Sequence, residues 1–126
     1  MYLLFSVFYY KPHAFSTFAK KILMADLTQQ QWSEQLENDD NSVIIDVRTD
    51  AELEAGYIPG AIQIDIFNGA EFLKRARELD PEKNYYIYCR SGARSGQACM
   101  LLNSVGVKNA YNLKGGFMDW EGKKTK

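Results

Sequence analysis

The 126-residue chain contains one histidine and two cysteines, and it has no excess of positive charge. The formal net charge is −1, so no basic surplus exists to neutralise phosphates, and no nucleic-acid partner is expected. Cys89 and Cys99 are too few for a disulfide framework and are typical of a reducing compartment such as the cytoplasm. No CxxC pair is present, and His13 lies outside the part of the chain that looks folded. We therefore expect no metal and no cofactor.

The length of the chain suits one domain, which we place at residues 25–122. Residues 1–24 form an apolar and basic extension, and residues 123–126 form a basic tail. The opening run MYLLFSVFYY is too short to span a bilayer and has neither the preceding basic residues nor the cleavage site of a signal peptide. A start codon upstream of the true one, with Met24 beginning the domain, is favoured over an anchor at a membrane surface.

Strand-like and helix-like segments alternate along the domain. Thr28 and Gln31 form a predicted capping box, and Thr49 or Asp50 is expected to cap the second helix. We expect strands at 42–47, 61–66, 84–89 and 109–114, and helices at 28–38, 49–56, 69–80 and from 94 onward to Gly106, with a short helix or turn after residue 114. This order predicts an α/β fold: a doubly wound parallel sheet of about five strands with helices on both faces.

The stretch NYYIYCRSGARSG, residues 84–96, carries an apolar strand directly into Cys89. Ligands of an open parallel sheet bind beyond the carboxyl ends of its strands, which is where this cysteine lies. Gly92 and Gly96 allow the backbone to curl around a small centre with its N–H groups pointing inward, and a helix begins there. Arg90 and Arg94 add positive charge. We therefore predict a nucleophilic cysteine whose pKa lies below the usual value of about 8.5.

The alternative interpretation of Cys89 is a buried cysteine at a strand end, and two nearby arginines argue against it. Cys99 receives the opposite interpretation. It lies on the apolar face of the following helix, where its thiol is expected to stay protonated and inert.

Four segments together resemble the single-domain rhodaneses, a family of sulfurtransferases. They are IIDVRTDAEL (44–53), AGYIPGAIQI (55–64), YIYCRSGARS (86–95) and NLKGGFMDW (112–120). Their order and spacing cover nearly the whole expected domain. The family fold is a doubly wound α/β domain, which agrees with the pattern of strands and helices.

The resemblance implies a reaction and a set of site residues. In rhodaneses a cysteine thiolate takes the outer sulfur of a donor such as thiosulfate and passes it to cyanide, a cellular thiol or a protein acceptor. Carried over, Cys89 holds the persulfide, and the loop formed by Arg90, Ser91, Gly92, Ala93, Arg94 and Ser95 stabilises it through backbone N–H groups. Arg90 and Arg94 bind the sulfonate end of the donor; the alternative for each is an ion pair at the rim of the loop.

The remaining family segments are interpreted as support for the site. Asp46 and Arg48 are expected to form an internal ion pair beneath it rather than to take part in catalysis. Tyr57 stands where the family usually has histidine, so a hydrogen bond made by that histidine is in doubt. Gly115 and Gly116 are expected to allow the backbone to approach the active loop closely.

Two other functions stay open. Phosphatases of this fold need a cysteine, five intervening residues and an arginine, whereas here Arg94 comes one residue earlier and Ser95 takes that place. The shorter loop suits a single sulfur atom better than phosphate, and the same argument applies to arsenate reduction. The second alternative is a sulfur carrier or binding module that serves one protein partner, which the sequence does not exclude.

Overall fold

The computed structural model describes residues 26–126, so the interpretation of residues 1–24 lies outside it. Five strands form one sheet in the order β1-β5-β4-β2-β3, and every pair of neighbours is parallel. The strands are β1 (Asp26–Leu27), β2 (Ser42–Asp46), β3 (Ile62–Gln63), β4 (Asn84–Tyr88) and β5 (Asn109–Leu113). The predicted fold class is confirmed. Strand β1 was not predicted, and β3 is shorter than the alternation at 61–66 indicates.

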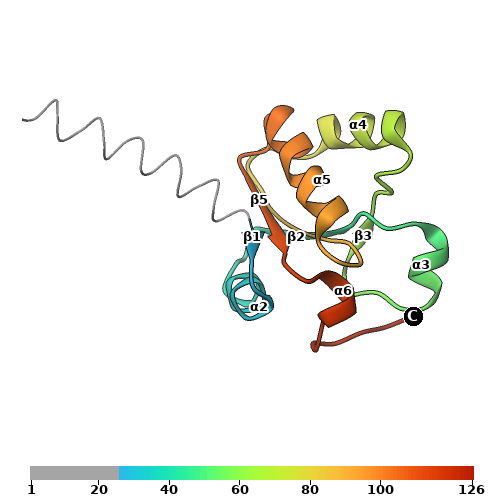
Figure 1. Cartoon of the computed structure of the whole chain (residues 1–126). Coiled ribbons are helices and arrows are strands. Elements are labelled where there is room, and N and C mark those ends of the chain that lie inside the picture. Colours follow the sequence, from blue (N-terminus) through green and yellow to red (C-terminus); the bar gives the residue numbers. More distant parts are fainter. Residues whose placement is uncertain (1–25) are drawn as a thin grey trace, which may run out of the picture.

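Five helices connect or follow the strands (Figure 1). They are α2 (Gln29–Glu37), α3 (Asp50–Glu54), α4 (Gly69–Glu78), α5 (Ala93–Ser104) and α6 (Gly116–Asp119). The capping box of Thr28 and Gln31 is present at α2. Thr49 caps α3 and forms a second capping box with Glu52. In each box two backbone N–H groups at the start of the helix find a side-chain acceptor. This pairing explains why these short helices begin where they do.

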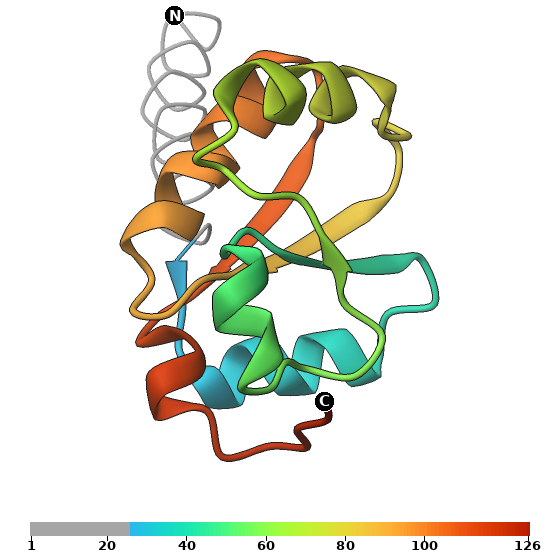
Figure 2. The ribbon, with the colours of Figure 1, turned by 90° about the vertical axis from the view of Figure 1, so that its right-hand side faces the viewer.

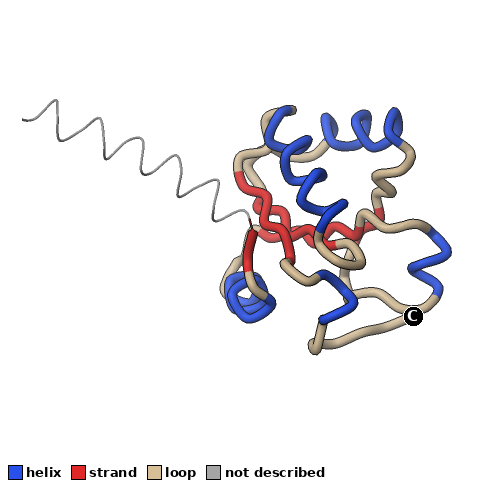
Figure 3. The backbone as a smooth tube through the Cα atoms, viewed as in Figure 1, coloured by secondary structure: helices blue, strands red, loops and turns tan. Residues whose placement is uncertain are grey.

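The helices lie in two layers, one on each face of the sheet (Figures 1 and 3). Helices α4 and α5 cover one face, and α2 and α6 cover the other. Two apolar clusters fill the spaces between sheet and helices. The first includes Phe72 of α4 and Leu102 of α5, and the second includes Trp32 of α2 and Trp120 after α6. Both faces of the sheet are therefore buried, as a parallel sheet requires.

Strand β4 lies in the middle of the sheet, between β5 and β2 (Figure 2). Its side chains alternate between the two cores: Tyr85 and Ile87 belong to the cluster under α4 and α5, and Tyr86 and Tyr88 belong to the other cluster. Cys89 continues this alternation on the side of α5. The strand therefore delivers the sulfur to the carboxyl edge of the sheet, beside the start of α5.

The C-terminal residues return to the middle of the chain. Tyr57 and Thr125 form an antiparallel bridge in which each backbone N–H donates to the other's carbonyl oxygen at 2.9 Å. Tyr57 thus holds the C-terminal tail through its backbone.

Candidate active site

Cys89 follows β4 directly and is fully buried in the first apolar cluster, so the expectation that two nearby arginines speak against burial is wrong. Two backbone hydrogen bonds from the start of α6 hold this part of the chain. The N–H of Phe117 donates to the carbonyl oxygen of Cys89 at 2.8 Å, and that of Met118 donates to the carbonyl oxygen of Arg90 at 2.9 Å. With these two carbonyl groups paired to α6, the N–H groups that follow are left to face the sulfur.

The Cys89 sulfur accepts hydrogen bonds from the other side of its own loop. The Gly92 N–H lies 3.0 Å from Sγ, and the Ser95 hydroxyl oxygen lies 3.3 Å from it. Gly92 has a φ of 104°, a left-handed value that favours glycine and that turns its N–H toward the sulfur. Burial alone raises the pKa of Cys89, but hydrogen bonds from Ser95, Gly92 and Ser91 outweigh it and bring the pKa below its usual value. The predicted direction is confirmed.

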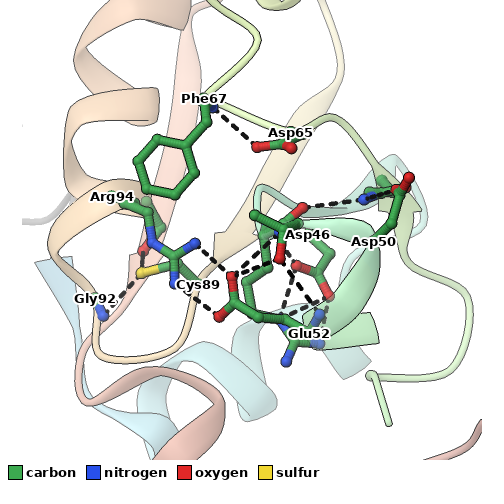
Figure 4. Close-up of polar contacts among 12 residues, drawn as sticks. Asp46, Asp50, Glu52, Asp65, Phe67, Cys89, Gly92 and Arg94 are labelled. Carbon is green, nitrogen blue, oxygen red and sulfur yellow. Dashed lines mark hydrogen bonds and ion pairs between the residues drawn. The ribbon is translucent and has the colours of Figure 1, made fainter. Parts of the chain in front are cut away.

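The two arginines have different surroundings. The guanidinium group of Arg94 forms a bidentate ion pair with Glu52, at 2.7 and 2.8 Å, and lies over the ring of Phe67 (Figure 4). This pair is the main reason that the pKa of Glu52 falls to about 2. Arg90 is exposed and forms no ion pair with any residue between 26 and 126. Of the two interpretations given for each arginine, donor binding or an ion pair at the rim of the loop, the ion pair is present for Arg94.

The Cys89 pKa was predicted to fall through the loop N–H groups, the start of the helix and the charge of Arg90 and Arg94 together. Hydrogen bonds of the loop are the leading favourable cause, and the first of them comes from the Ser95 side chain, which had not been assigned this effect. The guanidinium group of Arg94 donates hydrogen bonds to Glu52. Arg90 is exposed to solvent, which screens the charge of Arg90. Ser91 and Ala93 are exposed, and the backbone N–H of Ser91 is among the groups that lower the Cys89 pKa.

Asp46 and Arg48 form the predicted internal ion pair. Arg48 Nη2 lies 2.7 Å from Asp46 Oδ2 and also donates to the carbonyl oxygen of Gly56 at 2.8 Å. The guanidinium carbon lies 4.4 Å from the centre of the Phe117 ring. Both charged side chains are buried, at 0% and 4% exposure. Their contacts link the end of β2 to α6 and leave the Cys89 sulfur untouched, which fits a structural role.

One residue that was not predicted from the sequence, Asn112 of β5, forms hydrogen bonds to the loop around the sulfur. The Ser95 hydroxyl donates a short hydrogen bond to Asn112 Oδ1. The Asn112 amide nitrogen donates to Asp26 Oδ1 at 2.7 Å and to the Gly92 carbonyl oxygen at 3.0 Å. Asn112 opens the family-like segment NLKGGFMDW, and its place at the carboxyl end of a strand was the available signal.

Cys99 lies on the buried face of α5, in the cluster shared with α4. Burial raises the pKa of its thiol to about 12. The expectation that Cys99 stays protonated is confirmed. Both cysteines are free thiols.

Gly116 packs against the backbone of the active loop. A Cβ atom added to it would collide with the carbonyl group of Arg90 and with the N–H of Ser91. Its φ of 62° and the 83° of Gly115 are both left-handed. The close approach predicted for this glycine pair is therefore present, and Gly116 is the residue that requires it.

A parallel five-stranded sheet with a buried, hydrogen-bonded cysteine at the carboxyl end of its central strand defines an α/β domain with a cysteine active loop. The sequence matches the rhodanese-like domain over residues 28–123, and the chain belongs to that family.

Relatives and solved structures agree with this assignment. A sulfurtransferase of Allochromatium vinosum is 34% identical over 98 residues, which are 78% of this chain and 89% of that protein. A rhodanese-like domain protein from Staphylococcus aureus is 30% identical, with a TM-score of 0.67 over 79% of this chain and 94% of that one. A tRNA uridine(34) hydroxylase of Nitrobacter winogradskyi is 36% identical, but the match spans 72% of this chain and only 36% of that protein. Sulfur transfer is the general activity that these similarities support.

Within residues 26–126, no helix is long and apolar enough to cross a membrane. The same part of the chain contains no group of three or more His, Cys, Asp or Glu side chains able to hold a metal ion.

Proposed function

We propose that this domain transfers sulfane sulfur from a donor such as thiosulfate to a thiophilic acceptor through a persulfide on Cys89. One observation carries the proposal: the Cys89 sulfur accepts hydrogen bonds from the Gly92 N–H at 3.0 Å and from the Ser95 hydroxyl at 3.3 Å. These donors stabilise negative charge on sulfur, and charge on sulfur is what both the nucleophile and the persulfide carry.

In the first step the Cys89 thiolate attacks the outer sulfur of thiosulfate. A new S–S bond forms, the S–S bond of thiosulfate breaks, and its electron pair leaves with sulfite. In the second step cyanide or a thiolate attacks the outer sulfur of the persulfide, and the electron pair of that S–S bond returns to Cys89. The loop N–H groups stabilise the anionic sulfur of the thiolate and that of the persulfide, so the same loop assists both half-reactions.

Arg90 is the arginine proposed to bind the sulfonate end of the donor. It is exposed at the rim, and no carboxylate between residues 26 and 126 forms an ion pair with it. Arg94, held by Glu52, is proposed to stiffen the loop and to contribute charge at a longer range. Arg90→Ala should therefore raise the KM for thiosulfate more than it lowers kcat.

Cyanide and small thiols are the simplest acceptors of the sulfur, and a protein thiol or a sulfur-carrier protein is the alternative. A reactive thiolate in a chain with two free thiols is suited to a reducing compartment, which supports a cytoplasmic location.

The test is sulfur transfer from thiosulfate to cyanide by the wild-type protein and by Cys89→Ala. The wild type should show ping-pong kinetics, and Cys89→Ala should fall to the uncatalysed rate. Intact-mass measurement after treatment with thiosulfate should show one added sulfur atom on the wild type and none on Cys89→Ala.

Sulfur transfer retained in Cys89→Ala would contradict the persulfide mechanism. Absence of the added sulfur, together with hydrolysis of a phosphate ester at a comparable rate, would favour the phosphatase alternative instead. Persulfide formation without release to cyanide or small thiols would favour a carrier that serves one protein.

A further inference from the structure

The hydroxyl group of Ser95 has one proton and two acceptors within reach. Its oxygen lies 3.3 Å from Cys89 Sγ and within a short hydrogen bond of Asn112 Oδ1. Ser95 and Cys89 are fully buried and Asn112 is 6% exposed, so the network has little access to water. Because a hydroxyl donates only one hydrogen bond, Ser95 serves the sulfur or the amide oxygen, but not both.

The Asn112 amide cannot turn to remove this competition. Its nitrogen donates to Asp26 Oδ1 at 2.7 Å and to the Gly92 carbonyl oxygen at 3.0 Å, and both partners are acceptors. Exchanging the amide oxygen and nitrogen would place oxygen against oxygen twice. The pairing of β1 with β5, which sets Asp26 beside Asn112, therefore fixes the amide oxygen toward Ser95.

We propose that Asn112 is a positioning residue that competes with Cys89 for the Ser95 proton, so that the hydroxyl turns toward the sulfur only while that sulfur carries negative charge. This inference rests on the proposed function, in which Cys89 is the nucleophile. When Cys89 is a thiol, Ser95 donates to Asn112 and accepts from S–H. When Cys89 is a thiolate, the charge attracts the hydroxyl, because hydrogen bonds to ionised groups are about twice as strong as neutral ones.

The device follows the charge through the reaction. Persulfide formation moves the negative charge from the Cys89 sulfur to the outer sulfur, so the hydroxyl turns back to Asn112. Return of the electron pair in the second half-reaction draws it to Cys89 again. Ser95 neither gains nor loses its proton in either step; it only rotates about its C–O bond.

Other charged groups near the sulfur come from several elements. Arg94 of α5 interacts electrostatically with Cys89 and Asp65 and is paired with Glu52 of α3. Asp26 of β1 reaches the site through Asn112. Arg90 is exposed on the loop itself. Of these groups only Asp26 is affected by the substitutions below, because Asn112→Leu removes a hydrogen bond that Asp26 accepts. The double variant with Ser95→Ala separates that effect from the change in the Ser95 hydrogen bond.

The first test measures the Cys89 pKa from the pH dependence of alkylation by iodoacetamide, in a Cys99→Ala background. Ser95→Ala should raise the pKa, because the sulfur loses a donor. Asn112→Leu should lower it by about one unit, because Ser95 keeps only the sulfur as acceptor. The double variant should match Ser95→Ala alone. The matched control is Asn109→Leu, the same change at the other end of β5, where the side chain binds Asn84; it should leave the pKa unchanged.

A purely structural role for Asn112 would instead give a higher or unchanged pKa in Asn112→Leu, or an added effect in the double variant, and either result overturns the proposal. Asn112→Asp serves if the leucine variant does not fold, as judged by circular dichroism. It keeps an acceptor and should raise the pKa more when Ser95 is present than in Ser95→Ala. An equal rise in both backgrounds overturns the proposal as well.

The second test separates the two half-reactions. A lower pKa makes the Cys89 thiolate a weaker nucleophile and a better leaving group. Asn112→Leu should therefore lower kcat/KM for thiosulfate about threefold and raise kcat/KM for cyanide by a similar factor. A fall in both values overturns the proposal. The alkylation test does not depend on sulfur transfer. The proposal about Asn112 and the proposed reaction can therefore fail separately, and the two outcomes can be told apart.

Discussion

Cys89 and Cys99 are both buried free thiols, and both contact the apolar cluster under α4 and α5. Their chemistry differs because of what surrounds each sulfur. Cys89 has donors from Ser95 and Gly92 within hydrogen-bond distance, whereas burial dominates at Cys99 and raises its pKa to about 12. Burial by itself makes a thiol inert; burial combined with inward-pointing donors lowers the pKa. The hydrogen-bond donors of the loop, the Ser95 hydroxyl first among them, separate the two sites more than exposure or nearby arginine does.

The largest expected effect tests this comparison directly. With iodoacetamide at pH 7.5, Cys89 should react at least about tenfold faster than Cys99, because hydrogen-bond donors lower the pKa of Cys89 while burial raises that of Cys99 to about 12. The weaker nucleophilicity of a thiolate with a lower pKa offsets only part of this difference. Peptide mapping by mass spectrometry after timed alkylation measures both rates in one sample. As the pH rises through the Cys89 pKa its rate should level off, while that of Cys99 should keep rising. Comparable rates at neutral pH would contradict the comparison.

The second expected effect removes the loop geometry while leaving Cys89 in place. In Gly116→Ala the new methyl group collides with the Arg90 carbonyl and displaces the loop N–H groups from the sulfur. Sulfur transfer should fall tenfold or more, since small displacements at a reacting group carry large penalties, about a hundredfold for 1 Å. The Cys89 pKa should rise toward its usual value.

Gly106→Ala is the matched control for that substitution. Gly106 also has a left-handed φ, of 105°, but nothing lies within 4 Å of an added Cβ. Both variants therefore lose stability from backbone strain, of about 1–2 kcal/mol, and only Gly116→Ala should lose activity beyond the loss of folded protein. Equal activity in the two folded variants would show that the contact with Arg90 does not position the loop.

The smallest expected effect concerns the ion pair at the rim. Both side chains are partly exposed, at 20% and 26%, so solvent screening limits the loss in Glu52→Gln to about 1 kcal/mol or less. The pKa of Glu52 is about 2 in the folded protein and 4.5 without its partners. The stabilisation is therefore complete above pH 4.5 and disappears as the pH falls toward 2.

Urea unfolding of wild type and Glu52→Gln at several pH values measures this difference. The two free energies of unfolding should differ above pH 4.5 and converge toward pH 2. A difference that persists unchanged at low pH would assign the effect to the capping box of Thr49 and Glu52 rather than to the ion pair. Release of Arg94 should also lower the Cys89 pKa slightly, which sharpens the contrast with Cys99.

Much of the fold could be predicted because its signals are local. The capping residues Thr28 and Thr49, the apolar run into Cys89 and the stop at Gly106 each lie within a few residues of what they determine. Strand β1 was missed because its two residues are too few to show periodicity, and its pairing depends on β5 at the far end of the chain. Strand β3 came out short for a related reason: only two of its residues find partners on β2.

The candidate site could be predicted in part. The sequence places Cys89 at a strand end and supplies the glycines of its loop. The partners Glu52 and Asn112 could not be found in this way, because each meets the loop only after distant strands and helices have packed. From the sequence, Arg94 was therefore predicted to bind the donor. In the structure its guanidinium group is held by Glu52, which lies 42 residues earlier in the sequence.

The two hydrogen bonds from Phe117 and Met118 to the loop also have a consequence for biosynthesis. The segment that holds the Cys89 and Arg90 carbonyl groups is α6, which follows the loop and all five strands of the sheet in the sequence, so a ribosome makes it after them. A nascent chain that ends before Gly116 already contains Cys89 but has no α6 to fix its loop. We therefore expect the cysteine to gain its lowered pKa only when α6 has left the ribosome and has packed against the loop.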